Sequence, residues 1–311
     1  MDYSFRRDET SADAARRIAS EQLEGALSEL CATTEVDKSV HGVRKRLKKL
    51  RGLLQLLEGA LGRRVVAREN RCYRDAARAL AGARRAAAIV AAFDALMQRC
   101  PDAIPAEARA ELRGGLIAER DRLVALMQGG SQVPDVTAAL RASVARLESW
   151  PLEVEGWQVL RSGFRRSYAR GRRALKVAMR EPTTENLHEW RKFAKHYWYH
   201  VRLLARLWPE AMKVHEAALE RLGDDLGDEH DLDDLRLSLI AHMPPEQLRE
   251  ATGRVLAAIE ARRDELRASA FARGRYLYAE RPRAATERVG AYHAAWLARS
   301  PGPGDDADRD G

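Results

Sequence analysis

The chain has 311 residues, of which 54 are lysine or arginine and 46 are aspartate or glutamate, for a formal net charge of +8. This length allows one large domain or two smaller ones, and the abundance of Ala, Leu, Arg and Glu favours helix. A basic chain can attract nucleic acid, an anionic membrane or another polyanion, and net charge alone does not choose among them.

Several classes of protein are not expected from this sequence. The longest apolar run, Ala86 to Phe93, is far shorter than the ~20 residues that a membrane-spanning helix needs. The first residues lack the apolar segment of a secretory signal. The three cysteines, Cys31, Cys72 and Cys100, show no CxxC spacing and agree better with reduced thiols than with a disulfide framework. We therefore expect a cytoplasmic protein with no membrane partner.

Helical periodicity fills the first half of the chain. Residues 1–10 are polar, and we expect a flexible N-terminus there. Helices are predicted over residues 11–31, 40–61, 65–99, 106–127 and 136–148. Pro101 and Pro105 end the third of these helices, and Gly129 with Gly130 closes the fourth, because proline and glycine commonly mark helix ends.

The second half repeats this plan after a seam at residues 149–156. Helices are predicted over residues 157–180, 184–206, 210–242, 246–272 and 284–299. The last segment, 301–311, is acidic and rich in proline and glycine, which is typical of disorder. No strand-like alternation stands out, so the predicted fold class is all-α.

Two similar segments indicate an internal duplication. Val40–Leu57 reads VHGVRKRLKKLRGLLQLL, and Leu187–Leu204 reads LHEWRKFAKHYWYHVRLL. Four basic positions of the two segments match at a constant separation of 147 residues: His41 with His188, Arg44 with Arg191, Lys45 with Lys192 and Lys48 with Lys195. We therefore predict one region over 11–300 made of two antiparallel helical bundles in a pseudo-two-fold arrangement, with halves at about 11–148 and 157–299.

Both segments place their cations opposite an apolar stripe when drawn at ~100° per residue. The first arc holds His41, Arg44, Lys45 and Lys48, and the second holds His188, Arg191, Lys192, Lys195 and Arg202. Neither arc contains an acidic residue, since Glu189 lies off the second one. Like charges three or four residues apart repel by ~0.2–0.5 kcal/mol per pair. Because both copies keep this repulsion, we expect an anion to supply the missing charge.

A plainer interpretation is that these arcs are solvated charged faces, which are common on single surface helices. The helix before the second arc is also basic, with Arg166 and Arg173 on its polar side, and we include both among the expected anion contacts. Taken alone, this helix could equally be a solvated face. Its first-half counterpart is far less basic, so the site is expected to be lopsided.

The duplicated H-x-x-R-K/R-x-x-K motif in an all-helical chain resembles the CHAD family (conserved histidine α-helical domain) over roughly residues 10–300. YARGRRAL, Tyr168–Leu175, is similar to the basic helix that precedes the second histidine in that family. LGDDLGDEHDLDDL, Leu222–Leu235, is similar to its LG-x-x-RD-x-x-x-L segment. The resemblance implies that inorganic polyphosphate is the partner, bound by the two histidine motifs, and that the protein associates with polyphosphate granules.

The chain departs from the family pattern at two places. His230 replaces the usual arginine before Asp231, and in the first half Arg84 is kept while Arg85 stands in place of the aspartate. The contacts implied for these positions are therefore in doubt, whereas the two histidine motifs are intact.

An enzyme is the first alternative. The pair His230-Asp231 lies in an acidic segment and could belong to a metal-dependent phosphohydrolase if further ligands came from other helices, such as His188, His196, His200, His215 and His242. The structural interpretation is that these carboxylates pair with basic helices. No phosphate-binding loop, nucleophile elbow or dinucleotide fingerprint is present. We expect a binding protein without catalytic residues, cofactor or metal.

A nucleic-acid-binding protein is the second alternative. Binding of single strands without sequence preference usually needs aromatic side chains beside the cations, and only 6% of the chain is aromatic. Trp190 and Tyr197 lie on the apolar stripe, but Trp198 and Tyr199 lie on the basic side, so this alternative remains. An anionic membrane surface is a third one, although the basic arc lacks the adjoining apolar face of an interfacial helix.

Overall fold

The computed structural model describes residues 3–31, 36–80, 82–128, 132–153, 155–241 and 246–299, and the side chains of 36–38, 82–84, 126–128 and 132 are not described. These residues form helices and no strand, which confirms the predicted all-α class. The helices are α1 (Ser11–Cys31), α2 (Val36–Leu56), α3 (Glu58–Ala79), α4 (Gly82–Arg99), α5 (Ala106–Gln128), α6 (Gln132–Ala145), α7 (Trp157–Arg180), α8 (Thr184–Leu203), α9 (Pro209–Ala241), α10 (Arg249–Leu277) and α11 (Pro282–Ala298), with short 3-10 turns at Ala205–Leu207 and Glu246–Leu248.

The helices of the second half follow the order of those in the first. At a separation of 147 residues, α1 and α2 correspond to α7 and α8, while α5 and α6 correspond to α10 and α11. The pair α3 and α4 corresponds to the single long helix α9. This order agrees with the repeat in the sequence; the duplication and the boundary between the halves stay predictions.

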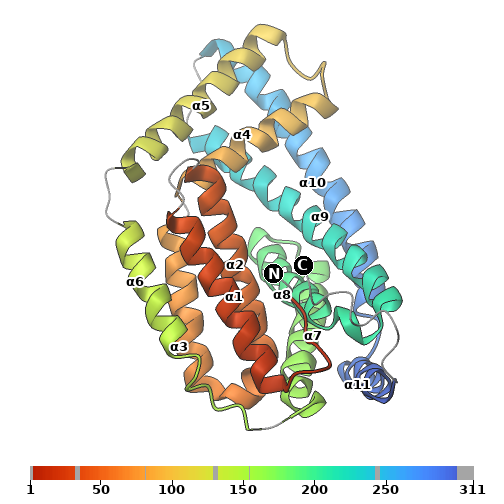
Figure 1. Ribbon diagram of the computed structural model, residues 1–311. Coiled ribbons are helices and arrows are strands. Elements are labelled where there is room, and N and C mark those ends of the chain that lie inside the picture. Colours follow the sequence, from red (N-terminus) through yellow and green to blue (C-terminus); the bar gives the residue numbers. More distant parts are fainter. Residues whose placement is uncertain are drawn as a thin grey trace.

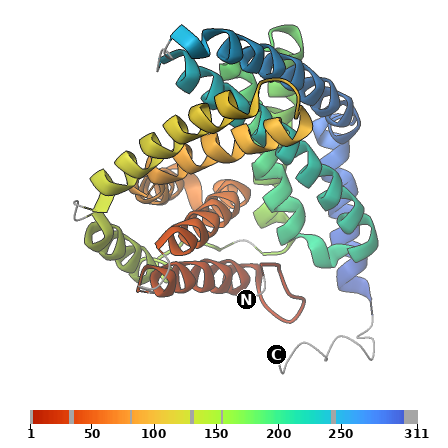
Figure 2. The same ribbon diagram turned by 90° about the horizontal axis from the view of Figure 1, so that it is seen from above.

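Two hydrophobic clusters form the interior, and each draws on both halves of the chain. The larger one lies among α1, α2, α3, α6, α7, α8 and α11, with parts of α9 and α10. The smaller one lies among α4, α5, the second part of α9 and the first part of α10. Figure 1 shows α4 and α5 at the top of the molecule, where one end each of α9 and α10 reaches them, and Figure 2 shows the same layout from above. The two cores therefore do not coincide with the two predicted halves.

Helix boundaries differ from the predictions in the first half. The pattern predicted as one helix over 65–99 is divided into α3 and α4, and the first motif helix ends at Leu56 rather than near residue 61. Gly62 takes a φ of 75° inside α3, a conformation that glycine adopts without steric cost. Leu61 and Val66 are buried on either side of Gly62, so the apolar pattern continues across the break and conceals it.

The two motif helices, α2 and α8, contact each other directly. A Cβ atom on Gly52 of α2 would lie 2.7 Å from Cβ of Tyr199 of α8, so only glycine allows this approach. The Nε2 atom of the buried His200 donates a hydrogen bond to the carbonyl oxygen of Gly52 at 3.1 Å. Gly52 and Tyr199 are also 147 residues apart, and such equivalent positions meet where a two-fold axis passes.

Residues 3–10, predicted to be flexible, lie against the motif helices. Tyr3 and Phe5 are each 6% exposed. The Phe5 amide donates to the carbonyl oxygen of Leu203 at 3.1 Å, and the Tyr3 hydroxyl donates to that of Lys49 at 2.7 Å. Two aromatic rings at alternate positions bury enough apolar surface to hold this segment, which its polar composition had concealed. The predicted disordered tail, 301–311, lies outside the described residues.

None of the helices in the described ranges combines the length and apolarity needed to cross a membrane.

The crossing of α7 and α2 yields a stability prediction. A Cβ atom on Gly163 would lie 1.9 Å from the carbonyl oxygen of Leu56, and a backbone atom cannot rotate away. We expect Gly163→Ala to lower the free energy of unfolding by about 1–3 kcal/mol through overpacking, measured by urea denaturation. Gly114→Ala is the matched control: Gly114 lies in α5 with nothing within 4 Å of its added Cβ, and it should stabilise by about 0.5–1 kcal/mol. Equal effects of the two variants would contradict the close crossing.

Two histidines of α8, the buried His200 and the half-buried His196, predict a dependence of stability on pH. Burial lowers the pKa of His200 to about 4. Burial, and then repulsion from His200 and Arg51, lowers the pKa of His196 to about 3. In the unfolded chain both titrate near 6.5. The unfolded state therefore takes up protons as the pH falls below 6.5 and the folded state does not, so stability decreases by up to about 1.4 kcal/mol per pH unit for each histidine.

Urea denaturation between pH 7 and pH 5 measures this slope. Above pH 5 most carboxylates stay ionised, so the histidines dominate the change. The double variant His196→Gln/His200→Gln should show a shallower slope than the unaltered chain. An unchanged slope would mean that these side chains are not held neutral by the fold.

Candidate anion-binding site

Helix α8 carries the second histidine motif along the surface of α9. The helix begins after Thr183, whose hydroxyl accepts a hydrogen bond from the Asn186 amide at 3.2 Å, as is usual for an N-cap. A Cβ atom on Gly223 of α9 would lie 2.5 Å from Nζ of Lys195, and one on Gly227 would lie 3.2 Å from Nη2 of Arg191. The two glycines thus leave the space in which these cations lie across α9.

Arg191 and Lys195 differ in how their charges are balanced. Arg191 makes no ion pair or hydrogen bond with any described residue, and its Nε atom is buried without a partner. Lys195 has its Nζ atom 3.7 Å from Oδ1 of Asp224. Burial lowers the pKa of Lys195, and Asp224 opposes this effect. Arg191 is therefore a partly buried guanidinium with donors to offer.

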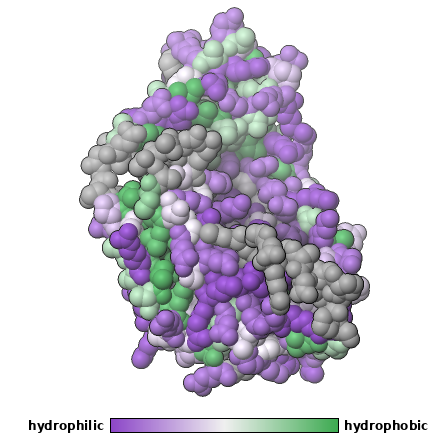
Figure 3. Space-filling view, in the orientation of Figure 1, coloured by the Kyte–Doolittle hydropathy of each residue, from purple (hydrophilic) through white to green (hydrophobic). Residues whose placement is uncertain are grey.

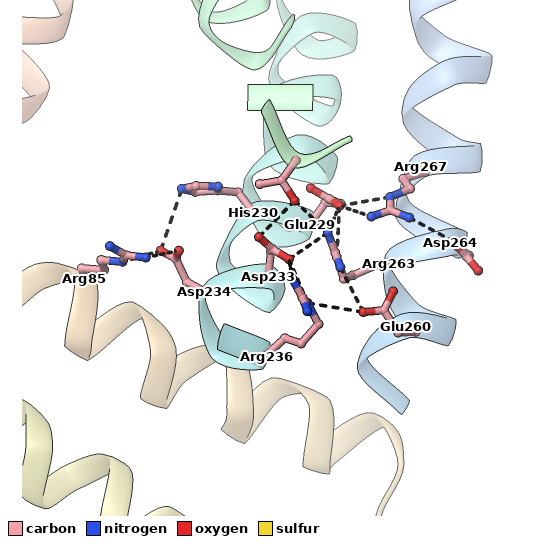
Figure 4. A network of polar contacts seen from close by, with 11 residues as sticks. Arg85, Glu229, His230, Asp233, Asp234, Arg236, Glu260, Arg263, Asp264 and Arg267 are labelled. Carbon is pink, nitrogen blue, oxygen red and sulfur yellow. Dashed lines mark hydrogen bonds and ion pairs between the residues drawn. The ribbon is translucent and has the colours of Figure 1, made fainter. Parts of the chain in front are cut away.

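His188 connects this surface to the first half of the chain. Its ring lies 5.1 Å from that of His230, centroid to centroid, and burial followed by repulsion from His230 and Arg191 lowers its pKa. Nε2 of His230 lies 3.8 Å from Asp234, and Arg85 of α4 donates to both oxygens of Asp234 at 3.0 and 2.6 Å (Figure 4). The Arg85 guanidinium is thus engaged in this ion pair, while the side chain of Arg84 lies outside the described residues.

Cations of the two motif helices meet beside Tyr3. Nζ of Lys49 lies 4.9 Å from the Tyr3 ring centroid, and Cζ of Arg202 lies 6.0 Å from it. Burial lowers the pKa of Lys49 to about 8, and repulsion from Arg202 and Lys45 adds to the effect. Lys49 is not among the residues predicted from the sequence, because it lies beyond the arc of the four matched positions, one turn after Lys45.

A second group of cations lies on the other side of the contact between α2 and α8. Arg51, Lys192 and Arg170 are close enough to His196 to lower its pKa by repulsion. Arg51 is itself half-buried and donates to Oδ1 of Asn70 at 2.9 Å, and burial lowers its pKa. The sequence could not show that Arg51 and Arg170 belong here, because their proximity depends on which helices meet.

The eleven predicted residues lie on α2, α7 and α8, and several of them are paired with carboxylates. Carboxylates pair with four of them: Glu189 with Lys192, Asp224 with Lys195, Glu216 with Arg202 at 3.1 Å and Glu58 with Arg166 at 2.6 Å. The expectation of an unneutralised stripe is wrong for these four, because neighbouring helices and Glu189 supply acidic side chains that the arc alone does not reveal.

The remaining predicted residues lie on α2 and α7. Arg44 donates to the carbonyl oxygen of Ala77 in α3, and is thus turned toward a neighbouring helix rather than fully outward. His41 and Lys48 are exposed on α2. Lys45 and Arg173 are exposed and have no ion pair or hydrogen bond within the described part of the chain. In Figure 3 hydrophilic residues cover much of the face of the molecule that is seen in Figure 1, apart from the part drawn in grey.

The acidic segment of α9 pairs with arginines of α10. Nη2 of Arg263 lies 3.0 Å from Glu229 and 3.0 Å from Asp233, and all three side chains are at most 4% exposed. Arg267 also binds Glu229, and Arg236 binds Asp233 (Figure 4). These contacts support the structural interpretation of the segment.

The same network fixes the start of α8, because the Thr184 hydroxyl donates to Asp233 at 3.1 Å, one turn before His188. Among the described residues no three His, Cys, Asp or Glu side chains are placed to hold a metal ion; His242 lies outside them.

A comparison of the sequence with protein-family models identifies the family of this chain. The family model of the CHAD domain matches residues 15–239, which is more than half of the chain and includes both histidine motifs. No curated protein matches the sequence. The extent of the family match shows that the chain belongs to the CHAD domain family.

Proposed function

We propose that this protein binds inorganic polyphosphate on the basic surface formed by α2 and α8, and that it acts in the cytoplasm as an accessory protein of polyphosphate granules. Membership of the CHAD domain family supports polyphosphate as the ligand, and the arrangement of cations supports the surface of α2 and α8 as the place where it binds.

Arg191 carries the proposal. A partly buried guanidinium without an acidic partner is costly, yet Gly227 of α9 leaves space for it. Phosphate oxygens accept charge-assisted hydrogen bonds from arginine in a forked geometry. A phosphate group beside Arg191 would also lie near Lys195 and His188, so one segment of the polymer would contact several donors.

Lys49, which lies beside Tyr3, provides a second argument for a polyanionic ligand. The pKa of Lys49 is lowered to about 8 by burial and by neighbouring cations. A bound polyanion stabilises the charged form and so raises this pKa. Binding at pH 8 should accordingly be accompanied by proton uptake, an effect that a neutral ligand would not produce.

The environment of Trp198 favours a chain of phosphates over nucleic acid. Nζ of Lys195 and Cζ of Arg202 lie 4.9 and 4.8 Å from the centroid of its ring, and the Tyr199 ring lies 4.9 Å away. Tyr199 is itself buried. Since nucleobases bind by stacking on free aromatic faces, rings already covered by other side chains offer them little. Polyphosphate has no bases and needs only the cations.

The proposal treats the protein as a binding protein rather than an enzyme. Two carboxylates beside the pair His230-Asp231, those of Glu229 and Asp233, are held by Arg263 and Arg267. A phosphate-release assay on polyphosphate with added divalent metals tests this, and sustained turnover would contradict it.

Two unpaired cations provide the mutational test. Lys45→Ala/Arg191→Ala removes one from each motif without breaking a described ion pair. We expect polyphosphate affinity to fall by about tenfold or more, because each charge-assisted contact contributes about 1.5–3 kcal/mol. Isothermal titration at two salt concentrations measures it, and the slope of log K against log salt should decrease in magnitude by about 2.

Arg63→Ala/Arg64→Ala is the matched control, since it changes the net charge equally at two exposed residues of α3. If both double variants weaken polyphosphate binding alike, the attraction is due to net charge and the proposed site is wrong.

In a competition titration, polyphosphate should displace single-stranded DNA from the protein efficiently. The reverse order of affinity would favour nucleic acid as the ligand.

A further inference from the structure

Helix α7 presents cations on two different sides. Arg166 and Arg170 point toward Glu58 of α3, at 2.6 and 3.9 Å. Arg161 and Arg165 lie about 100–180° away around the helix at ~100° per residue, and they face α11. The second pair is therefore separate from the surface of α2 and α8.

A pocket lies between α7 and α11 at this second pair. Its volume is about 300 Å³, and its lining residues are Arg161, Arg165, Arg283, Thr286 and Glu287. Small-molecule sites commonly begin near this volume, so the pocket suits a ligand of one or two phosphate groups rather than a long folded polymer.

The charges that line the pocket are unbalanced. Nε of Arg283 lies 2.7 Å from Oε1 of Glu287, but Arg161 and Arg165 make no ion pair or hydrogen bond with a described residue. The charges of Arg161 and Arg165 reach Glu287: its pKa is lowered first by its hydrogen bond with Arg283 and further by the charges of these two arginines. Three guanidinium groups against one carboxylate leave an excess of two positive charges.

The position of Arg283 adds to this imbalance. It stands in the first turn of α11, which contains no acidic residue, and a cation at a helix N-terminus is disfavoured by the helix dipole. An anion in the pocket would relieve both the repulsion among the arginines and this unfavourable placement.

We propose that the pocket between α7 and α11 binds the terminal phosphate dianion of a small ligand, with pyrophosphate as its simplest form. Arg161 and Arg165 donate forked hydrogen bonds to the phosphate oxygens, and Arg283 adds a third positive charge. The site is independent of the proposed binding of polyphosphate to α2 and α8.

Isothermal titration of the full chain with pyrophosphate tests the site. It is carried out in the Lys45→Ala/Arg191→Ala background, so that the motif surface contributes little. Arg161→Ala/Arg165→Ala should weaken the one-to-one binding by about tenfold or more. Glu287→Gln removes the one carboxylate of the pocket and frees Arg283, so it should tighten binding severalfold. The control Arg63→Ala/Arg64→Ala should leave the affinity unchanged.

The ligand source is distinguished by a parallel titration with ADP. Equal affinities for ADP and pyrophosphate indicate that the terminal phosphates alone are recognised, and a stronger ADP signal indicates a phosphorylated metabolite with further contacts. The proposal is overturned if pyrophosphate shows no saturable binding, or if the Arg161/Arg165 and Arg63/Arg64 variants behave alike. Polyphosphate binding should survive Arg161→Ala/Arg165→Ala, so failure of one site is separable from failure of the other.

Discussion

Repulsion between like charges is the constraint around which the motif helices are built. Lys49 and Arg202 come from different helices and share the ring of Tyr3, while Arg51 and Lys192 flank His196. Surface cations would separate if they were free to do so. They are held together by buried contacts at the centre of the same helices, where Gly52 meets Tyr199 and His200. The packing of α2 on α8 thus maintains an arrangement of like charges that an anion would stabilise.

The ion-pair network between α9 and α10 holds the start of α8, the helix that carries the second histidine motif. Arg263 joins Glu229 to Asp233 in a nearly dry environment, and Asp233 accepts a hydrogen bond from Thr184 at the start of α8. Removing one partner of such a buried group leaves an uncompensated charge and commonly costs about 3–5 kcal/mol. These acidic residues therefore fix the start of the helix that carries the second histidine motif.

Periodicity predicted the helical class and most helix positions, because each helix buries one continuous apolar side. It failed at Leu57 and between α3 and α4, where the apolar pattern crosses a break. The matched motifs located Arg191 and Lys195, yet a single-helix projection could not show that α9 supplies Asp224 and two glycines beneath them. Arg51 and Arg170 were missed for the same reason, because their proximity to His196 arises from contacts between helices distant in sequence.

Helix α9 is 33 residues long and passes without interruption from one hydrophobic cluster to the other. Its first part buries Leu219 and Leu222 in the larger cluster, and its later part buries Leu235 in the smaller one. Because a formed helix is extended at little further cost, the part of α9 that is packed in one cluster favours its continuation into the other. The two clusters are thus joined by one uninterrupted helix, and α4 and α5 pack on a helix that is anchored in the larger cluster.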